Sequence, residues 1–304
     1  MAAITAAMVK ELREMTGAGM MDCKKALSET DGNMDEAVEV LRKSGAAKAE
    51  KKASRIAAEG ICRIACDGNK AVVAEVNSET DFVAKNEVFQ EFVQKVADSA
   101  LASGLQGGKD GEDVEALLEK DGLKDLLVEK TAKIGEKLSV RRFERVEADC
   151  VATYIHGGGR IGVLVAAKTP DTGDAIKEAL TNIAMQVAAL SPKFISQKDV
   201  DQAFLEHEKE IIKAQIENDP KEAAKPDKVK EGMIMGRINK EMKEYCLLDQ
   251  VYVKAEDGKQ SVAKYLESVN KDLVIEKFIR FEVGEGMEKK NEDFAAEVAA
   301  QMNA

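Results

Sequence analysis

The chain has 304 residues, enough for two or three compact units, and its 44% apolar and 33% charged residues support real cores in a soluble protein. A net charge of −11 argues against a broad nucleic-acid-binding surface, and no run approaches the ~18 consecutive apolar residues of a membrane span, so we expect neither direct nucleic-acid binding nor membrane binding. Five scattered cysteines and an N-terminus without a secretion signal predict a cytoplasmic protein with reduced thiols.

Residues 4–45 have the pattern of three short helices. Ile4, Met8 and Leu12 recur at helical spacing, the loop TGAG (16–19) ends the first helix, and a DGN turn ends the second. Asn33 with Glu36 makes a plausible capping box for the third. A unit this small is expected to present a surface to a partner. Met20 and Met21 are either exposed apolar groups on that surface or residues that pack between the helices.

A basic segment follows, KSGAAKAEKKASR at 43–55, with five basic residues against one glutamate. Its alanine and lysine content favours a helical or semi-rigid linker, or simply a solvated tether.

The central region contains an internal repeat. DGNKAVVAEV (67–76) aligns with GGGRIGVLVA (157–166) at an offset of 90 residues. The same offset places a helix over 88–103 onto 178–193, matching Ala97 with Val187 and Ala100 with Leu190. LSVRRFERV (138–146) aligns with LVIEKFIRF (273–281) at an offset of 135, so the second copy is expected to hold an insertion of 135 − 90 = 45 residues, over 199–243.

We therefore predict an α+β fold with a duplicated core, each half a small antiparallel sheet with helices. The insertion is expected to be an antiparallel helical hairpin, opened by a cap from Ser196 and Asp199 and broken near its two prolines. Its apolar stripe favours self-association through 199–243, or folding back on the core. The predicted units are 1–55, a three-helix domain with linker; 56–148, the first core half; 149–198 and 244–283, the second half; 199–243, the hairpin; and 284–304, a C-terminal module with a helix.

The chain carries no recognisable catalytic constellation. It has two histidines and no nucleophile-elbow, zinc-protease or phosphate-loop motif. GGGRIG (157–162) fits a dinucleotide fingerprint but precedes a strand, and Cys62 with Cys66 lacks a second ligand pair. His156 has no evident partner. We expect no metal, no cofactor and no enzymatic activity, and favour an interaction protein.

One polar loop, NSETDFVAKN at 77–86, holds an aromatic residue between a predicted strand and a predicted helix. Phe82 either packs beneath its own helix, near Val83 or Phe89, or is exposed for another protein. The residues alone favour the first alternative.

Four motifs, taken in order, resemble bacterial elongation factor Ts. They are REMTGAGMMDCKKAL (13–27), the loop at 77–86, HGGGRIGVLVAAK (156–168) and IRFEVGEGMEKKNEDFAAEVA (279–299). The resemblance covers nearly the whole chain and implies a guanine nucleotide exchange factor that binds elongation factor Tu with GDP or without nucleotide. It also implies that the N-terminal unit resembles a ubiquitin-associated domain.

The resemblance also implies contact residues. Thr80, Asp81, Phe82 and Val83 match the motif that reaches toward the magnesium site of the partner. The other implied contact residues are Arg13, Met20, Met21, Cys23, Lys24, His156, Phe294 and Val298. Residues 105–127 and 252–254 are weakly similar to the family, and no contact is carried over there. The alternative from another class is a non-enzymatic adaptor whose N-terminal domain binds a ubiquitin-like or peptide ligand.

Overall fold

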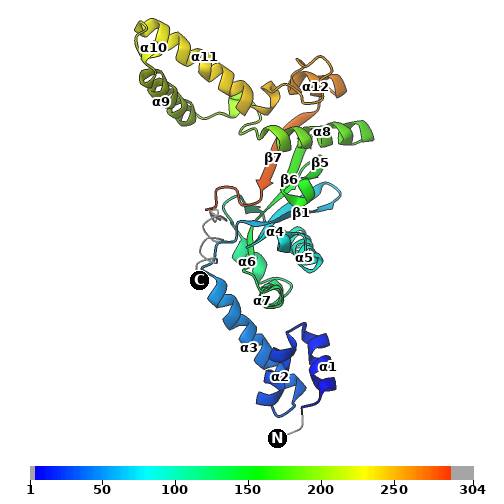
Figure 1. Cartoon of the computed structure of the whole chain (residues 1–304). Helices are drawn as coiled ribbons and strands as arrows, with labels where there is room; N and C mark the ends of the chain where they lie inside the picture. The colour runs from blue at the N-terminus through cyan, green and yellow to red at the C-terminus, as the bar shows by residue number, and fades with distance from the viewer. Residues whose placement is uncertain (1–3, 289–304) are drawn as a thin grey trace.

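The computed structural model describes residues 4–288 and shows an elongated molecule. A three-helix unit lies at one end, a core of strands and helices in the middle, and a helical hairpin at the other end (Figure 1). The fold is mixed α and β with antiparallel sheets, as expected. None of the helices in this part of the chain combines the length and apolarity that a membrane crossing requires.

The N-terminal unit contains three helices, and the third runs past residue 45, where the sequence predicted it to end. Its helices are α1 (Ala6–Thr16), α2 (Met20–Glu29) and α3 (Met34–Lys52). Asn33 caps α3 by accepting from the backbone N–H groups of Asp35 and Glu36, and Glu36 accepts from the Asn33 side chain instead of its backbone, so the capping box is half formed. The unit is held by a small core that includes Leu12, Cys23 and Leu27.

The basic segment is not a solvated tether, because residues 43–52 continue α3 as regular helix. This part of α3 packs against α7 (Leu123–Ile134), where Gly45 faces Val128 and Ala132. Small side chains let the two helices approach closely. Polar contacts reinforce the packing: Arg42 lies 2.8 Å from Asp125, and the Lys52 ammonium donates to the carbonyl of Thr131.

Two antiparallel sheets make up the core. The first has the order β1-β2-β4-β3, with β1 (Glu59–Asp67), β2 (Lys70–Ser78), β3 (Gly107–Gly108) and β4 (Ser139–Glu147). The second has the order β5-β6-β7, with β5 (Cys150–His156), β6 (Ile161–Lys168) and β7 (Val274–Glu282). The strands β4 and β7 begin 274 − 139 = 135 residues apart, the predicted offset.

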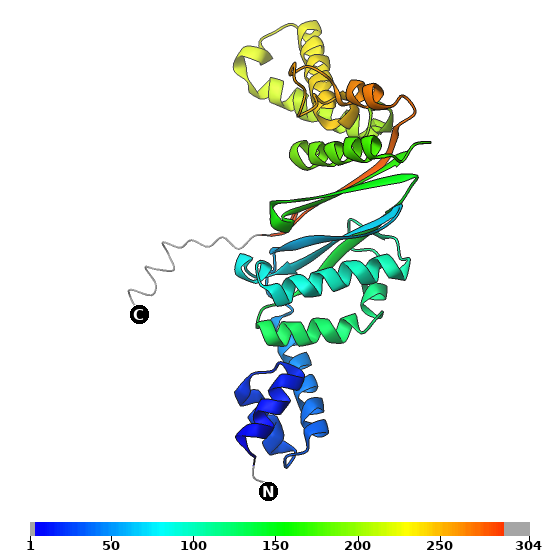
Figure 2. The ribbon, with the colours of Figure 1, turned by 90° about the vertical axis from the view of Figure 1, so that its right-hand side faces the viewer.

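The two sheets pack face to face, with helices on their outer faces (Figure 2). Between the sheets lies an apolar layer that includes Val73, Leu164 and Phe281. The first sheet is covered by α4 (Asp81–Ala84), α5 (Glu87–Ser103), α6 (Val114–Leu118) and α7, and the second by α8 (Asp174–Leu190) and α12 (Val262–Val269).

The helical part of the repeat has a different offset from the one predicted. α5 and α8 begin 174 − 87 = 87 residues apart, so Ala100 corresponds to Val187, and both are buried. Leu190, the predicted match of Ala100, is 47% exposed. The cause is the connection after the second strand of each half: residues 79–86 in the first half against residues 169–173 in the second. The first connection is three residues longer and contains α4.

A buried carboxylate ties the two halves together. Glu75 of β2 is fully buried and accepts from Arg141 (2.9 Å), Arg142 (2.6 Å) and the Asn77 side chain (3.1 Å). It also accepts from the backbone N–H of Gly284 (2.8 Å), just after β7. A side chain at 284 would collide with the carbonyl oxygen of Ala58, so only glycine fits there.

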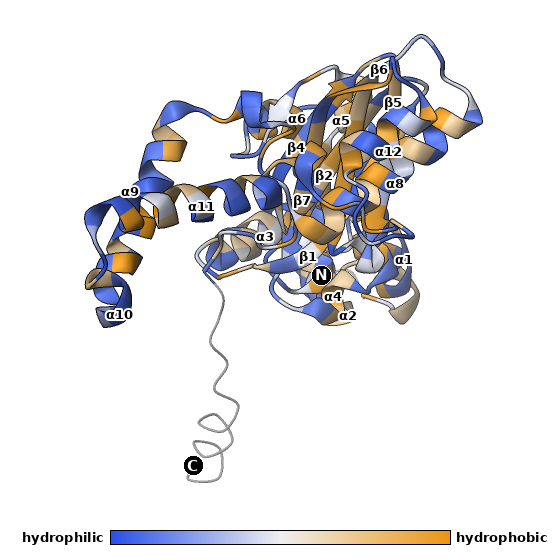
Figure 3. Cartoon of the chain, turned by 90° about the horizontal axis from the view of Figure 1, so that it is seen from above, coloured by the Kyte–Doolittle hydropathy of each residue, from blue (hydrophilic) through white to orange (hydrophobic). Residues whose placement is uncertain are grey.

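The inserted hairpin consists of α9 (Gln202–Asn218), a single turn α10 (Pro220–Ala223) and α11 (Asp227–Tyr245). Ser196 and Asp199 form a capping box, but around a separate short turn (Gln197–Asp199), and Asp201 caps α9. The apolar stripes of α9 and α11 mainly cover each other, through Ile212, Ile216, Ile238 and Met242. In Figure 3 apolar and polar residues alternate along both helices.

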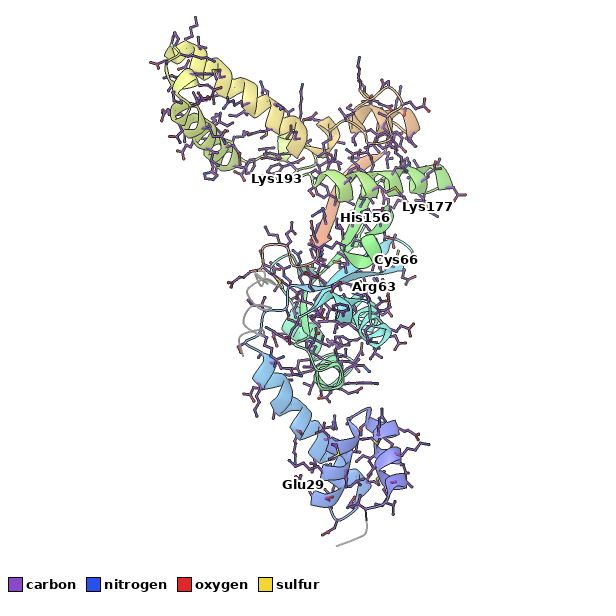
Figure 4. All side chains as sticks on the ribbon, in the orientation of Figure 1. Glu29, Arg63, Cys66, His156, Lys177 and Lys193 are labelled. Atoms are coloured by element: carbon purple, nitrogen blue, oxygen red, sulfur yellow. The ribbon has the colours of Figure 1, made fainter. Side chains whose placement is uncertain are left out.

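An aromatic cluster fixes the base of the hairpin. The Lys193 ammonium lies 3.9 Å from the centroid of the Tyr245 ring and 5.0 Å from that of Phe204. Phe204 also meets Phe194 edge to face. Figure 4 places Lys193 where α8 gives way to the hairpin. These contacts hold the hairpin in a defined direction from the core.

Glu241 introduces a pH dependence into the hairpin. Burial raises the pKa of its carboxyl group, and Glu208 and Glu244 raise it further, while Lys193 and Arg237 act in the opposite direction. A raised pKa means that the folded chain binds more protons than the unfolded chain between the two pKa values. The stability of the hairpin therefore falls as pH rises from about 4.5, the ordinary value for glutamate, through the raised pKa.

Replacing Glu241 by glutamine is accordingly expected to raise the stability of the hairpin at pH 7. Thermal unfolding followed by circular dichroism across pH 4–8 measures the effect, and the gain should shrink as pH approaches 4.5. Glu217→Gln, an exposed change of the same kind on α9, is the control. An equal gain at every pH would show that ionisation of Glu241 is not the cause.

Candidate partner-binding site

The loop after β2 turns Phe82 toward solvent. Thr80 caps α4 by accepting from the backbone N–H of Val83 with its hydroxyl oxygen, at 3.4 Å. Val83 and Ala84 are buried against the core. Successive residues of a helical turn point about 100° apart, so the residue before Val83 points away from the core. Phe82 is 79% exposed.

Packing of Phe82 beneath its own helix, which the residues alone favoured, is therefore wrong. Val83 and Phe89 fill the positions under the loop, and Phe82 does not join them. The Phe82 ring is the most exposed of the large apolar side chains in the described residues, and its place at the tip of an anchored loop leaves it available to contact another protein.

Asp81 and Lys85 place one negative and one positive charge beside the exposed Phe82 ring. The Lys85 ammonium donates to Asp81 at 2.6 Å and lies 5.8 Å from the centroid of the Phe82 ring. The hydrogen bond from Lys85 holds the pKa of Asp81 below its usual value. Lys85 was missed in the sequence, although its position four residues after Asp81 on a helical turn is a recognisable signal.

The three-helix unit carries a second exposed surface. Met20 and Met21 are exposed at the start of α2, as are Arg13 and Lys24 nearby in the sequence. Met15, at the end of α1, is exposed as well and was missed. Cys23 does not share this surface, because its side chain is fully buried and its thiol donates to the carbonyl of Ala18. The expectation that Cys23 contacts a partner is corrected accordingly: it packs the core of the unit.

The structure does not bring the remaining expected contact residues into one site. His156 is exposed at the end of β5, and its Nδ1 atom lies 3.0 Å from the Tyr154 hydroxyl (Figure 4). The loop with Phe82 and the surface with Met20 belong to other elements. Phe294 and Val298 lie outside the described residues.

A cleft lies where the three-helix unit meets α7. It encloses about 550 Å³ and is lined by residues such as Met15, Arg42, Asp125 and Lys133. Among residues 4–288, no group of three or more histidine, cysteine, aspartate or glutamate side chains is arranged to hold a metal ion. The cleft and the exposed loop are both accessible surfaces of the described chain. The exposed apolar groups of the three-helix unit and of the Phe82 loop are available to contact another molecule.

Comparison with known proteins shows the family to which the chain belongs. The family model described as Elongation factor TS matches residues 79–285. A protein named Elongation factor Ts from Clostridioides difficile strain 630 is 50% identical over 312 aligned positions, which cover 99% of this chain and 100% of the relative. Another of that name, from Clostridium perfringens strain ATCC 13124, is 51% identical over 308 positions, covering 97% and 98%. The chain belongs to the elongation factor Ts family, and this membership supports a role in translation elongation.

Proposed function

We propose that this protein binds elongation factor Tu in its GDP-bound form, promotes release of GDP by disturbing the magnesium and phosphate site, and stays bound until GTP rebinds. The observation that carries the proposal is the exposed Phe82 ring on its anchored loop. Family membership and the length of the match favour this function over the adaptor alternative.

Such a factor needs no catalytic acid or base. It binds the partner in a conformation that holds nucleotide poorly, and the coupling is reciprocal, so nucleotide that rebinds expels the factor. About 4 kcal/mol of coupling corresponds to roughly a thousandfold weaker binding of nucleotide.

Burial of the Phe82 ring in the partner would supply part of this energy. Moving a phenylalanine side chain from water into an apolar gap contributes about 1.5–3 kcal/mol. Displaced magnesium would supply more, because the cation neutralises the phosphate charges of GDP. Asp81, ionised and paired with Lys85, adds negative charge beside the ring. Its proposed role is electrostatic, and it need not bind the metal.

The other surfaces would hold the factor in place. In this proposal the N-terminal unit contacts the nucleotide-binding domain through Met20, Met21, Arg13 and Lys24. The exposed methionines are adaptable apolar groups that suit a protein interface. His156 would meet a second domain of the partner, and Phe294 with Val298 would return to the first.

Stopped-flow release of a fluorescent GDP analogue from purified elongation factor Tu tests the function. We expect the chain to accelerate release in a concentration-dependent manner that saturates. The chain alone should bind no GDP in equilibrium dialysis. If release is unchanged at saturating concentrations of the chain, the proposed function is wrong.

Self-association through residues 199–243 stays a prediction. The helices of the hairpin cover most of each other's apolar surface, but Ile211, Val229 and Met235 remain exposed. If two copies pair here, sedimentation velocity should show a mass that rises with concentration, and Met235→Glu should return the chain to a monomer. A monomeric mass at about 100 µM would rule out a dimer of useful affinity.

A further inference from the structure

The base of the Phe82 loop is held by a carboxylate distant in the sequence. Glu136 follows α7, and its Oε2 atom accepts from the backbone N–H groups of Glu79 (3.1 Å) and Thr80 (3.0 Å). Its Oε1 atom accepts from the Thr80 hydroxyl at 2.7 Å. One side chain therefore occupies three donors of the two residues that precede α4.

The contact is reciprocal. Glu79 is mostly buried, and its Oε1 atom accepts from the backbone N–H of Lys137 at 2.6 Å. Residues 79–80 and residues 136–137 thus each supply a carboxylate that accepts from a backbone N–H group of the other segment. Arg55 also donates to Glu79, at 3.1 Å, and the Lys137 ammonium donates to the carbonyl oxygens of residues 53 and 55. The end of α3 joins the same junction.

This geometry restricts the loop before any partner binds. Hydrogen bonds from backbone N–H groups to an ionised carboxylate are stronger than neutral ones. The Thr80 hydroxyl donates to Glu136 while it accepts from Val83, so the cap of α4 and the junction share one side chain. A loop ordered in advance loses less conformational freedom on binding, and more of the contact energy remains for the complex.

We propose that Glu136 is a positioning residue: with Glu79 as its reciprocal partner, it fixes the loop so that the Phe82 ring enters the partner in one orientation. The functional part rests on the proposed exchange function. The ordering of the loop does not, and it can be measured on the chain alone.

Hydrogen–deuterium exchange tests the ordering directly. In Glu136→Ala, the amides of Glu79 and Thr80 should exchange about tenfold faster or more, since each loses a charge-assisted hydrogen bond. Glu136→Gln, which keeps an oxygen acceptor, should retain part of the protection. Glu119→Ala is the matched control, because Glu119 is exposed and, within residues 4–288, its carboxylate pairs only with Lys124. Unchanged exchange of these amides in Glu136→Ala would overturn the proposal.

A double-mutant cycle tests the role in exchange. Glu136→Ala should lower the saturating rate of GDP release several-fold when Phe82 is present, and should have almost no further effect in a Phe82→Ala background. An equal loss in both backgrounds would mean that Glu136 acts through general stability, and would overturn the positioning role. If the unmodified chain releases no GDP, the exchange function fails, while the amide exchange still decides whether Glu136 orders the loop.

Discussion

Replacing Phe82 by alanine is expected to slow release of GDP from elongation factor Tu by roughly 10- to 100-fold at saturating factor. The Phe82 ring makes few contacts within its own chain, so its contribution to the exchange reaction is expected to come from burial against the partner. Losing about 1.5–3 kcal/mol of burial, at 1.4 kcal/mol for each factor of ten, gives this range. Stopped-flow release with fluorescent GDP measures it.

Two further variants separate burial from folding. Phe82→Leu keeps much of the apolar volume and should retain an intermediate rate. Val274→Ala removes an exposed apolar group at the start of β7 and should not alter release. Urea unfolding of Phe82→Ala should stay within about 0.5 kcal/mol of the unmodified chain, as expected for an exposed position. Equal release by Phe82→Ala and the unmodified chain would leave the exchange function standing and remove the ring from its mechanism.

Replacing Glu75 by alanine is expected to destabilise the core by about 3–5 kcal/mol. Its carboxylate is the common acceptor for Arg141, Arg142 and the backbone of Gly284. Without it, the buried Arg142 loses its short partner while remaining surrounded by protein. The segment after β7 loses its attachment to β2 as well. Urea unfolding at pH 7 measures the change.

Glu147→Ala is the matched control for this change. Glu147 lies on β4 of the same sheet and pairs with Arg145 (2.7 Å) and Lys70 (3.7 Å), but it is partly exposed. Its removal should cost less than about 1 kcal/mol. Similar losses for Glu75 and Glu147 would contradict the view that burial makes the Glu75 network important.

Strand spacing could be predicted because the two core halves have similar strand sequences. Aligning LSVRRFERV (138–146) with LVIEKFIRF (273–281) placed β4 and β7 at the correct offset. The helix offset was wrong by three residues, since the alignment assumed connections of equal length. The extra residues belong to α4, and a one-turn helix has too few residues to produce a periodic signal.

The candidate site could be found from sequence only in part. Resemblance to the family identified Phe82, and the structure adds that the ring is exposed. Glu136 could not be found, because its hydrogen bonds join backbone groups more than fifty residues away and leave no pattern in composition or spacing. Cys23 illustrates the opposite error, in which a residue within a binding motif serves the core of its unit.

The course of α3 was also misjudged, for a reason of tertiary packing. Lysine-rich sequence suggested a tether, yet Gly45 is buried against Val128 and Ala132 and lets α7 pack closely. The exposed side chains of Lys43 and Lys51 and the buried Gly45 lie on different faces of one helix.

Because α3 is a single helix, it fixes the angle about its axis between the surface that contains Met20 and Met21 and the Phe82 loop. Its 19 residues span about 28 Å, and deleting one of them would turn the three-helix unit by about 100° while shifting it only ~1.5 Å. An insertion of seven residues, close to two full turns, would restore the facing direction at a separation larger by ~10 Å. A change in the length of α3 therefore alters the direction in which the three-helix unit faces more than its distance from the core. A partner that contacts both surfaces at once would accept only lengths of α3 that differ by nearly whole helical turns.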